Sequence, residues 1–227
     1  MFYFSRFYVL TVVANDLMEN ILNDETTGVI LVGGKNNRMG VNKALLKIDD
    51  TPIIDRSLDL LGSIFKSNII CTNDPVEIEY PNIQTIKDSY QNFGPLAGIH
   101  SALKKSDSQK VFVISCDMPF LTPSVIKHLL NIKTQEAIVL PCVDKNVEYL
   151  CGIYSKDLLP LLENVLSTVQ EAKVKNNDVT KSALSIWNFV ERVGAEIVDI
   201  EMERFYFSDM FFRINTQEDY EYVLERL

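Results

Sequence analysis

The sequence predicts an α/β protein whose core is a doubly wound, mainly parallel β-sheet with helices on both faces. Two observations support this fold class. Short apolar runs such as residues 27–32 (TGVILV) and 110–115 (KVFVIS) show no alternation of apolar and polar residues, which is typical of strands buried on both faces. Between these runs, apolar residues recur at helical spacing, and strands that alternate with helices form right-handed crossovers between parallel neighbours.

Four strands are expected in the first half of the chain, at residues 27–32, 68–72, 83–87 and 110–115. A helix is expected to begin after the first strand, because Thr51 as N-cap followed by Pro52 is a frequent helix start. The apolar stripe of that helix consists of Ile54, Leu58, Leu61 and Phe65. A second helix is expected over residues 96–104, between the third and fourth strands.

The same alternation continues in the second half of the chain. Thr122 and Pro123 predict another helix start of the cap-plus-proline kind. Strands are expected at residues 137–143, 150–154 and 196–200, helices at 158–166 and 185–193, and a polar surface excursion at 167–183. The last helix is expected to begin at Thr216, because Asp219 stands in the capping-box position. Its inward-facing residues are expected to be Tyr220, Val223, Leu224 and Leu227.

Length and charge limit the classes of function. The 227 residues suffice for one large α/β domain. We expect residues 1–26 to form an N-terminal extension outside its core, since they precede the first buried strand, with Met18 as an alternative translation start. The formal net charge of −9 argues against nucleic acid and anionic membrane surfaces as partners, because both attract a basic face. No apolar run approaches the length of a membrane span.

The cysteine pattern indicates a cytoplasmic protein. The four cysteines form no C-x-x-C pair and each lies in or beside an apolar run, so we expect buried, reduced thiols. They are Cys71, Cys116, Cys142 and Cys151. The two histidines, His100 and His128, fall on different expected helices, which gives a zinc site little support. His128 is expected to be solvated.

A glycine loop with three cations follows the first expected strand. In doubly wound sheets, ligands bind beyond the carboxyl ends of the strands. Gly33 and Gly34 occupy that position, and Lys35, Arg38 and Lys43 follow with no carboxylate among them. Glycines let backbone amides approach a phosphate closely, and cations neutralise its oxygens. A solvated charged loop is the alternative, but the position after a buried strand favours anion binding.

Neither common phosphate-binding pattern fits this loop. The dinucleotide pattern G-x-G-x-x-G is absent, because Gly33 and Gly34 are adjacent and Gly40 comes too late. The Walker pattern is absent as well, because Val41 follows Gly40 where that pattern requires lysine.

Residues 31–43 (LVGGKNNRMGVNK) instead resemble the L-A-G-G-x-x-x-R-M-G-x-x-K signature of nucleotidyltransferases that activate sugars and cofactors. Residues 94–99 (GPLAGI) and 116–120 (CDMPF) resemble elements of the molybdenum cofactor guanylyltransferase family, and 214–219 (INTQED) is similar to its closing I-N-T-P-E-D element. The resemblance extends from about residue 27 to the C-terminus. It implies a Rossmann-like nucleotidyltransferase fold in one domain over residues 27–227, with a nucleotide half at about 27–120 and an acceptor half at about 121–227.

The resemblance also implies a reaction. The terminal phosphate of molybdopterin would attack the α-phosphorus of GTP, giving the guanine dinucleotide cofactor and pyrophosphate. Such a transfer needs positioning and charge neutralisation rather than a nucleophilic side chain. GTP and a molybdopterin-type cofactor would be the substrates, Mg²⁺ the cofactor, and molybdoenzymes or cofactor-delivery proteins candidate protein partners.

Three residues would carry the chemistry by this resemblance. Lys43 would contact the α-phosphate, Arg38 the β- and γ-phosphates, and Asp117 would hold Mg²⁺, a hard cation suited to carboxylate and phosphate oxygens. The expected nucleotide-binding residues are Leu31, Val32, Gly33, Gly34, Lys43, Asn73, Asp88, Gly94, Pro95, Gly98 and Asp117.

Structural alternatives exist for some of these residues. Asp117 could cap the turn before Pro119, Asp88 could be an ordinary loop acid, and Asn73 could serve only as a turn residue. At the level of function, a sister nucleotidyltransferase that uses CTP or another phosphorylated acceptor is the nearest alternative. A non-catalytic nucleotide-binding regulator is a more remote one.

The sequence departs from the family pattern at several positions. Val32, Asn42 and Gln217 replace the usual alanine, aspartate and proline, and none of these changes removes a charged contact that the reaction needs. Tyr149 and Arg213 stand where the family often has proline and asparagine. The acceptor side of the site is therefore less well defined by the resemblance than the nucleotide side.

Overall fold

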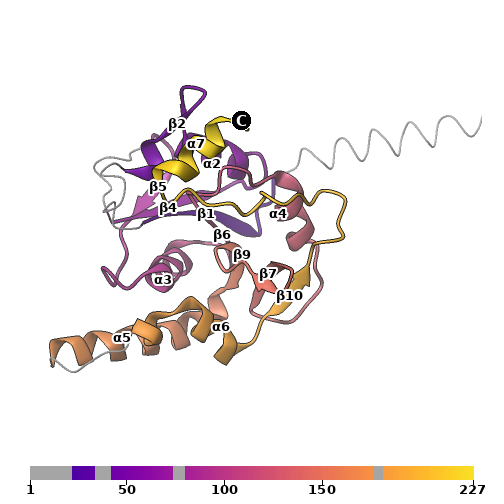
Figure 1. Ribbon diagram of the computed structural model, residues 1–227. Helices are drawn as coiled ribbons and strands as arrows, with labels where there is room; N and C mark the ends of the chain where they lie inside the picture. The colour runs from indigo at the N-terminus through magenta and orange to yellow at the C-terminus, as the bar shows by residue number, and fades with distance from the viewer. Residues whose placement is uncertain (1–21, 34–41, 74–79, 176–180) are drawn as a thin grey trace, which may run out of the picture.

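The computed structural model describes residues 22–33, 42–73, 80–175 and 181–227, except for the side chain of Lys181. Its centre is an eight-stranded sheet in the order β10-β7-β9-β6-β1-β4-β5, with β8 paired to β7 (Figure 1). The strands are β1 (Thr26–Val32), β4 (Asn68–Thr72), β5 (Gln84–Ile86), β6 (Lys110–Ser115), β7 (Ile138–Val143), β8 (Asn146–Val147), β9 (Cys151–Ser155) and β10 (Glu196–Asp199). Strands β2 (Lys47–Ile48) and β3 (Thr51–Pro52) form a separate hairpin.

The sheet has a parallel part and a mixed part. Strands β5, β4, β1 and β6 run parallel to one another, and β10 runs parallel to β7. Strand β9 is antiparallel to both of its neighbours, β6 and β7. The predicted doubly wound, mainly parallel sheet is confirmed, with β9 as an antiparallel strand that the pattern did not reveal. Because β9 runs in the opposite direction to β6, its first residues lie at the edge where β6 ends.

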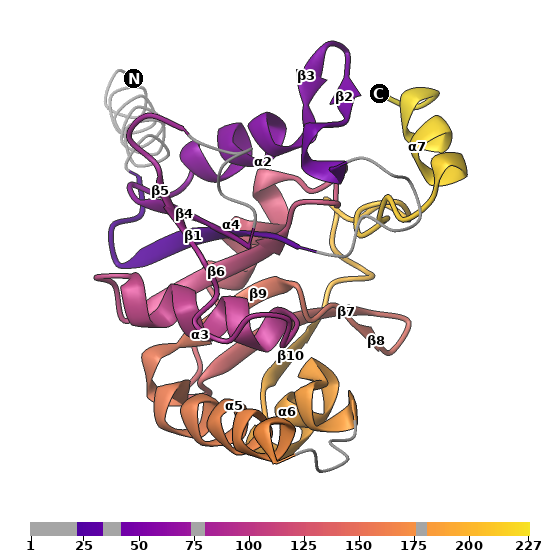
Figure 2. The same cartoon turned by 90° about the vertical axis from the view of Figure 1, so that its left-hand side faces the viewer.

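Helices cover both faces of the sheet (Figure 2). They are α2 (Ile53–Gly62), α3 (Pro95–Lys105), α4 (Pro123–Leu130), α5 (Leu159–Val174), α6 (Ile186–Val193) and α7 (Gln217–Leu224). The buried side chains of α2 and α4 join one core cluster, and those of α3, α5 and α6 join another on the opposite face. Strand β1 contributes to both, since Ile30 belongs to the first cluster and Val29 and Leu31 to the second.

The first predicted helix does not begin at Thr51 as expected. Thr51 and Pro52 form β3, and α2 begins at Ile53 without a side-chain cap. The reason is a tight turn at Asp49 and Asp50, whose φ angles of 49° and 62° reverse the chain into a two-residue hairpin. Phe65 lies beyond the end of α2, although it is buried as predicted.

Two predictions in the second half also need correction. Residues 167–174, expected as part of a polar excursion, continue α5 as an amphipathic helix that buries Leu166 and Val169. The last helix has the predicted capping box between Thr216 and Asp219, but Leu224 is 46% exposed and Leu227 44% exposed. Of the four residues predicted to face inward, Val223 is the buried one, because the short terminal helix packs against the core along a narrow stripe.

The remaining predicted helices and strands are confirmed within one or two residues. Of the predicted N-terminal extension (residues 1–26), residues 1–21 lie outside the described residues. Its end belongs to the core instead, because Thr26 is a buried residue of β1 and the backbone of Asn23 is hydrogen-bonded to Ile64 and Lys66. All four cysteines are buried and unpaired, as expected. His128 is partly buried rather than fully solvated, and its ring packs at 5.3 Å from that of Phe205. Within the described residues, no helix has both the length and the apolar character needed to cross a membrane.

Candidate active site

A pocket of about 350 Å³ opens at the carboxyl ends of the parallel strands. Strands β4 and β6 lie on opposite sides of β1, and the chain reverses its direction of winding there. Such a switch point is where doubly wound sheets bind ligands. The pocket is lined by Leu31, Val32, Gly33, Cys71, Asn73, Asp88, Asn92, Gly94, Pro95, Gly98, Ser115 and Leu150.

Most of the predicted nucleotide-binding residues that the structure describes meet in this pocket. Those brought together are Leu31, Val32, Gly33, Asn73, Asp88, Gly94, Pro95 and Gly98. Gly34 and Arg38 of the prediction lie in residues 34–41, outside the described residues. Lys43 and Asp117 do not line the pocket, but the hydroxyl of Ser115, which does, donates a hydrogen bond of 2.6 Å to the Asp117 carboxylate.

One end of the pocket is formed by Asp88 and its partner Asn73. The Asn73 amide donates to the Asp88 carboxylate at 3.0 Å, which joins the ends of β4 and β5. Burial raises the pKa of Asp88, and the hydrogen bond from Asn73 partly opposes that shift. A carboxylate in this position can accept hydrogen bonds from the hydroxyls of a ribose.

Two glycines shape the wall that α3 forms at that end, one by close packing and one by its backbone conformation. A Cβ at Gly98 would lie 2.9 Å from Cδ2 of Leu31 and 3.5 Å from the Asp88 carboxylate. Gly94, directly before the helix, has a φ of 71°, which favours glycine strongly. The GPLAGI segment therefore has glycine where α3 packs closely against Leu31 and where the chain turns into the helix.

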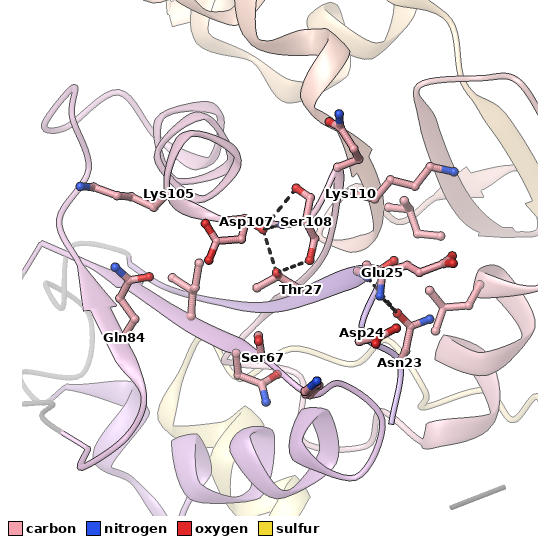
Figure 3. A pocket seen from close by; sticks show the side chains of 18 of the residues that line it. Asn23, Asp24, Glu25, Thr27, Ser67, Gln84, Lys105, Asp107, Ser108 and Lys110 are labelled. Atoms are coloured by element: carbon pink, nitrogen blue, oxygen red, sulfur yellow. Dashed lines mark hydrogen bonds between the residues drawn. The ribbon is translucent and has the colours of Figure 1, made fainter. Parts of the chain in front are cut away.

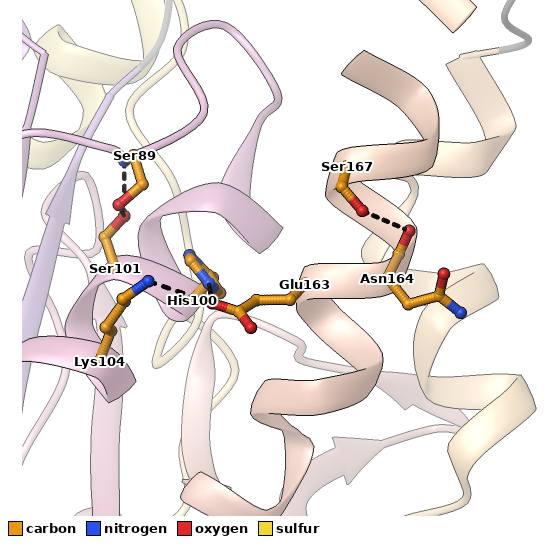
Figure 4. A network of polar contacts seen from close by, with 7 residues as sticks. All are labelled: Ser89, His100, Ser101, Lys104, Glu163, Asn164 and Ser167. Carbon is orange, nitrogen blue, oxygen red and sulfur yellow. Dashed lines mark hydrogen bonds and ion pairs between the residues drawn. The ribbon is translucent and has the colours of Figure 1, made fainter. Parts of the chain in front are cut away.

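A polar network behind α3 holds the pocket wall in place (Figure 4). Ser101 accepts a hydrogen bond of 2.8 Å from the backbone of Ser89, the residue after Asp88. His100, only 1% exposed, and Lys104 both contact Glu163 of α5, at 3.4 Å and 3.1 Å. Burial lowers the pKa of His100, and its bond to Glu163 opposes this. His100 is therefore a framework residue between two helices.

The other end of the site is a cluster around Lys43 and Asp117. The Lys43 ammonium donates to the backbone oxygen of Ile214 at 2.9 Å and to the side-chain oxygen of Asn215 at 3.2 Å. The backbone N–H of Ile214 donates to the backbone oxygen of Asp117 at 3.0 Å. One short C-terminal segment thus contacts both predicted catalytic residues. Lys43 and Ile214, which are joined by one of these contacts, lie 171 positions apart in the sequence.

The carboxylate of Asp117 is available for a ligand. Among the described residues its single hydrogen-bond donor is Ser115, and it caps no turn before Pro119. The described part of the chain has no group of three or more His, Cys, Asp and Glu side chains that could bind a metal by themselves. Mg²⁺ commonly uses one or two carboxylates together with substrate phosphates and water, so a single carboxylate at this position fits such an ion.

An ion pair beside this cluster was not predicted. Arg213 pairs with Glu148, and their side chains are only 29% and 14% exposed. Burial raises the pKa of Glu148, while the charge of Arg213 and a backbone hydrogen bond from Leu150 oppose the shift. One indication of it was present in the sequence. Tyr149 and Arg213 depart from the family pattern and so drew attention to this region, but they did not show that Glu148 is the partner of Arg213.

A second, larger pocket of about 970 Å³ lies at the opposite edge of the sheet (Figure 3). Its centre is a chain of hydroxyls in which Ser106 donates to Thr27 at 2.7 Å and Thr27 donates to Ser108 at 3.0 Å. Acidic and basic side chains such as Asp107 and Lys110 alternate around it. None of the predicted site residues that the structure describes lines this pocket.

Comparison with known proteins identifies related sequences. The model of the MobA-like NTP transferase domain matches residues 28–181. A protein of Clostridium perfringens named "Probable molybdenum cofactor guanylyltransferase" is 32% identical over 201 residues, which are 88% of this chain and 96% of the relative. A protein of Carboxydothermus hydrogenoformans with the same name is 31% identical, over 88% of this chain and 95% of the relative.

Solved structures show the same fold. A crystal structure from Aquifex aeolicus, 26% identical, matches with a TM-score of 0.64 over 85% of this chain and 94% of its own. The molybdopterin-guanine dinucleotide biosynthesis protein A of Archaeoglobus fulgidus matches with a TM-score of 0.70 over 88% of this chain and 97% of its own. At 24% identity, the second match is evidence for the fold alone.

Proposed function

Since the chain belongs to the family of MobA-like NTP transferases, we propose that it is a molybdenum cofactor guanylyltransferase, which transfers GMP from GTP to the terminal phosphate of molybdopterin. The observation that carries this proposal is geometric. The nucleotide residues that the resemblance indicated surround one pocket at the switch point, and Ser115 links that pocket to Asp117. The proposed nucleotide pocket and the proposed catalytic residue Asp117 therefore lie next to each other along one edge of the sheet.

In the proposed reaction, an oxygen of the acceptor's terminal phosphate attacks the α-phosphorus of GTP. A new P–O bond forms to the acceptor, the bond between the α-phosphorus and the β-phosphate oxygen breaks, and pyrophosphate leaves. No proton transfer from a side chain is needed, because both the attacking and the leaving group are phosphates. The protein therefore catalyses the reaction by placing the two reactants in line and by neutralising their negative charge.

Each end of the site has a part in this placement. Asp88 and Asn73 would receive the ribose, and the base would lie beside Leu31, where Gly98 has no side chain to fill the space. Lys43 would contact the α-phosphate, held in position by its bonds to Ile214 and Asn215. A cation fixed before the substrate arrives stabilises developing charge without reorganisation in the transition state.

Mg²⁺ is proposed as the cofactor, with Asp117 as its ligand from the chain. The ion would neutralise the triphosphate and polarise the reacting phosphorus. Ser115 fixes the Asp117 carboxylate by a 2.6 Å hydrogen bond, so this ligand is oriented in advance. Arg38 is proposed to contact the β- and γ-phosphates, and Gly34 to bring its backbone close to them.

We also propose a cytoplasmic location and delivery of the product to molybdoenzymes or to proteins that carry the cofactor. The four unpaired, buried cysteines are in keeping with a reducing compartment.

The decisive experiment is incubation of the full chain with molybdopterin, Mg²⁺ and GTP labelled at the α-phosphate, followed by identification of the product. The expected result is the labelled guanine dinucleotide cofactor together with pyrophosphate. Faster transfer from CTP than from GTP would assign the chain to a cytidylyl-transferring sister enzyme. Nucleotide binding without transfer to any phosphorylated acceptor would indicate a regulator instead.

A further inference from the structure

The segment before β9 supplies an additional charged group to the catalytic edge of the sheet. Because β9 is antiparallel to β6, residues 148–150 lie where β6 ends. The backbone N–H of Ser115 donates to the backbone oxygen of Leu150 at 3.0 Å, and the N–H of Leu150 donates to the Glu148 carboxylate at 2.8 Å. Glu148 is thereby held next to the strand that leads to Asp117.

Arg213 reaches the same place from the C-terminal segment. Its guanidinium donates to the Glu148 carboxylate, and its neighbour Ile214 bonds both Asp117 and Lys43 through the backbone. Arg213 is therefore one residue away from the connection between the two proposed catalytic groups.

The burial of this pair suggests a purpose beyond stability. Removing two charges from water has a desolvation cost that their attraction often only balances. A guanidinium has five N–H donors, and within the described residues the side chain of Arg213 makes one hydrogen bond, to Glu148. With 29% of its side chain exposed, the group has donors and accessible surface left for a ligand.

The order of the strands indicates which ligand Arg213 meets. Along the edge, Asp88 follows β5, Asn73 follows β4, Asp117 follows β6, and Glu148 precedes β9. Arg213 and Glu148 therefore lie beyond Asp117, on the side away from the pocket end that we assign to the ribose. In an in-line transfer the acceptor phosphate attacks the α-phosphorus on the side opposite to the leaving pyrophosphate, and a phosphate suits the planar fork of an arginine.

We propose that Arg213, oriented by its ion pair with Glu148, binds the terminal phosphate of the acceptor. Arg213 is then a substrate-binding residue and Glu148 a positioning residue that acts through it. This inference rests on the proposed function, since the acceptor is a phosphate monoester only if the chain transfers a nucleotide to one.

The test compares three variants, Arg213→Gln, Arg213→Lys and the double variant Arg213→Gln with Glu148→Gln. Steady-state kinetics would give kcat and KM for each substrate, and calorimetry would give the Kd of molybdopterin and of GTP. Arg226→Gln is the matched control, because Arg226 forms an ion pair with Asp209 at 3.4 Å in the same C-terminal segment.

Arg213→Gln should raise both the KM and the Kd for molybdopterin by about 10- to 100-fold, the range expected for loss of a charge-assisted contact, and leave GTP binding unchanged. Arg213→Lys should recover part of the affinity, and the double variant should be as impaired as Arg213→Gln. The control should bind both substrates normally.

Three results would overturn the assignment. Normal molybdopterin affinity in the double variant would reduce the pair to a structural role, and a selective loss of GTP affinity would place Arg213 on the donor. Unchanged affinity for both substrates in Arg213→Gln would exclude any contact. If the wild-type chain bound molybdopterin but transferred no GMP, the proposed function would fail, while the calorimetric comparison would still test Arg213.

Discussion

The two edges of the sheet differ in how their polar groups are used. At the amino edge, in the larger pocket, the hydroxyls of Ser106, Thr27 and Ser108 bond to one another. At the carboxyl edge, the carboxylates of Asp88 and Asp117 each receive one side-chain hydrogen bond from the described residues and retain further acceptor capacity. Pocket size alone would select the amino edge. Groups that are held in place but incompletely paired identify the candidate site.

This comparison is tested most severely at Asp117. Asp117→Asn keeps the size of the side chain and removes one negative charge from the proposed metal position. We expect kcat to fall by about 10²- to 10³-fold, as for loss of one preorganised electrostatic group, with little change in the melting temperature. Kinetics at limiting Mg²⁺ would measure the effect.

The matched variant at the amino edge is Asp107→Asn, a similar change to an exposed aspartate in the larger pocket. It should leave kcat unchanged. Equal loss of activity in both variants would mean that the two edges do not differ as described, and near-normal transfer by Asp117→Asn would remove its role as a metal ligand.

A smaller effect on kcat is expected from a change in the residues that hold the Lys43 ammonium in position. Among the described residues, the Lys43 ammonium has two hydrogen-bond acceptors, and Asn215→Ala removes one of them and leaves the backbone oxygen of Ile214. Loss of one hydrogen bond to a charged group should lower kcat by about tenfold. Gln217→Ala is the control, because this exposed amide two residues away bonds only Glu221 among the described residues. A similar loss in both variants would point to damage of the helix rather than of the site.

The close approach at the pocket wall predicts a still smaller effect on GTP binding. In Gly98→Ala the new methyl group would lie 2.9 Å from Leu31, so Leu31 must shift into the pocket. We expect the Kd of GTP to rise by roughly fivefold, equivalent to about 1 kcal/mol. Gly62→Ala, where a Cβ would meet nothing within 4 Å, should bind GTP normally. Calorimetry on both variants would decide, and unchanged affinity in Gly98→Ala would place the nucleotide elsewhere.

The smallest effect concerns stability and pH at Asp88. Burial raises the pKa of this carboxyl in the folded state, so folding favours its neutral form. The stability that the neutral carboxyl contributes is present at low pH and is lost as the pH rises through the raised pKa. Asp88→Asn should therefore unfold at a higher temperature than the wild type at neutral pH, and the difference should disappear in acid. Thermal melts at several pH values would measure it. A wild type that is more stable than the variant at neutral pH would contradict the prediction.

The parts of the fold that were predictable are those whose pattern is local. The buried strands β1 and β6 appear as uninterrupted apolar runs, and the capping box of α7 is contained in four residues. The hairpin at Thr51 was missed because a cap-plus-proline pattern also fits a strand that follows a turn with two positive φ angles. The C-terminal half of α5 was missed because its polar residues face solvent and its buried side chains are few.

The site was predictable to a different extent at its two ends. The nucleotide end was predicted through the resemblance to the nucleotidyltransferase signatures, and the structure brings the described residues of that set, except Lys43 and Asp117, into one pocket. The contacts that hold Lys43 and the pair between Arg213 and Glu148 join residues 171 and 65 positions apart. Contacts of that span depend on the direction of β9 and the path of the C-terminal segment, neither of which has a local signal.

The bond between Lys43 and Ile214 also sets an order of events during synthesis. Residues 26–155, which include every strand of the central sheet except β10, leave the ribosome before residues 214–215. The residues that line the proposed nucleotide pocket therefore leave the ribosome while Lys43 still lacks the backbone oxygen and the amide that hold it. Contacts of long sequence separation form late, because the entropy of closing a long loop must first be overcome. The arrangement around Lys43 is therefore completed only when the last residues of the chain have been synthesised.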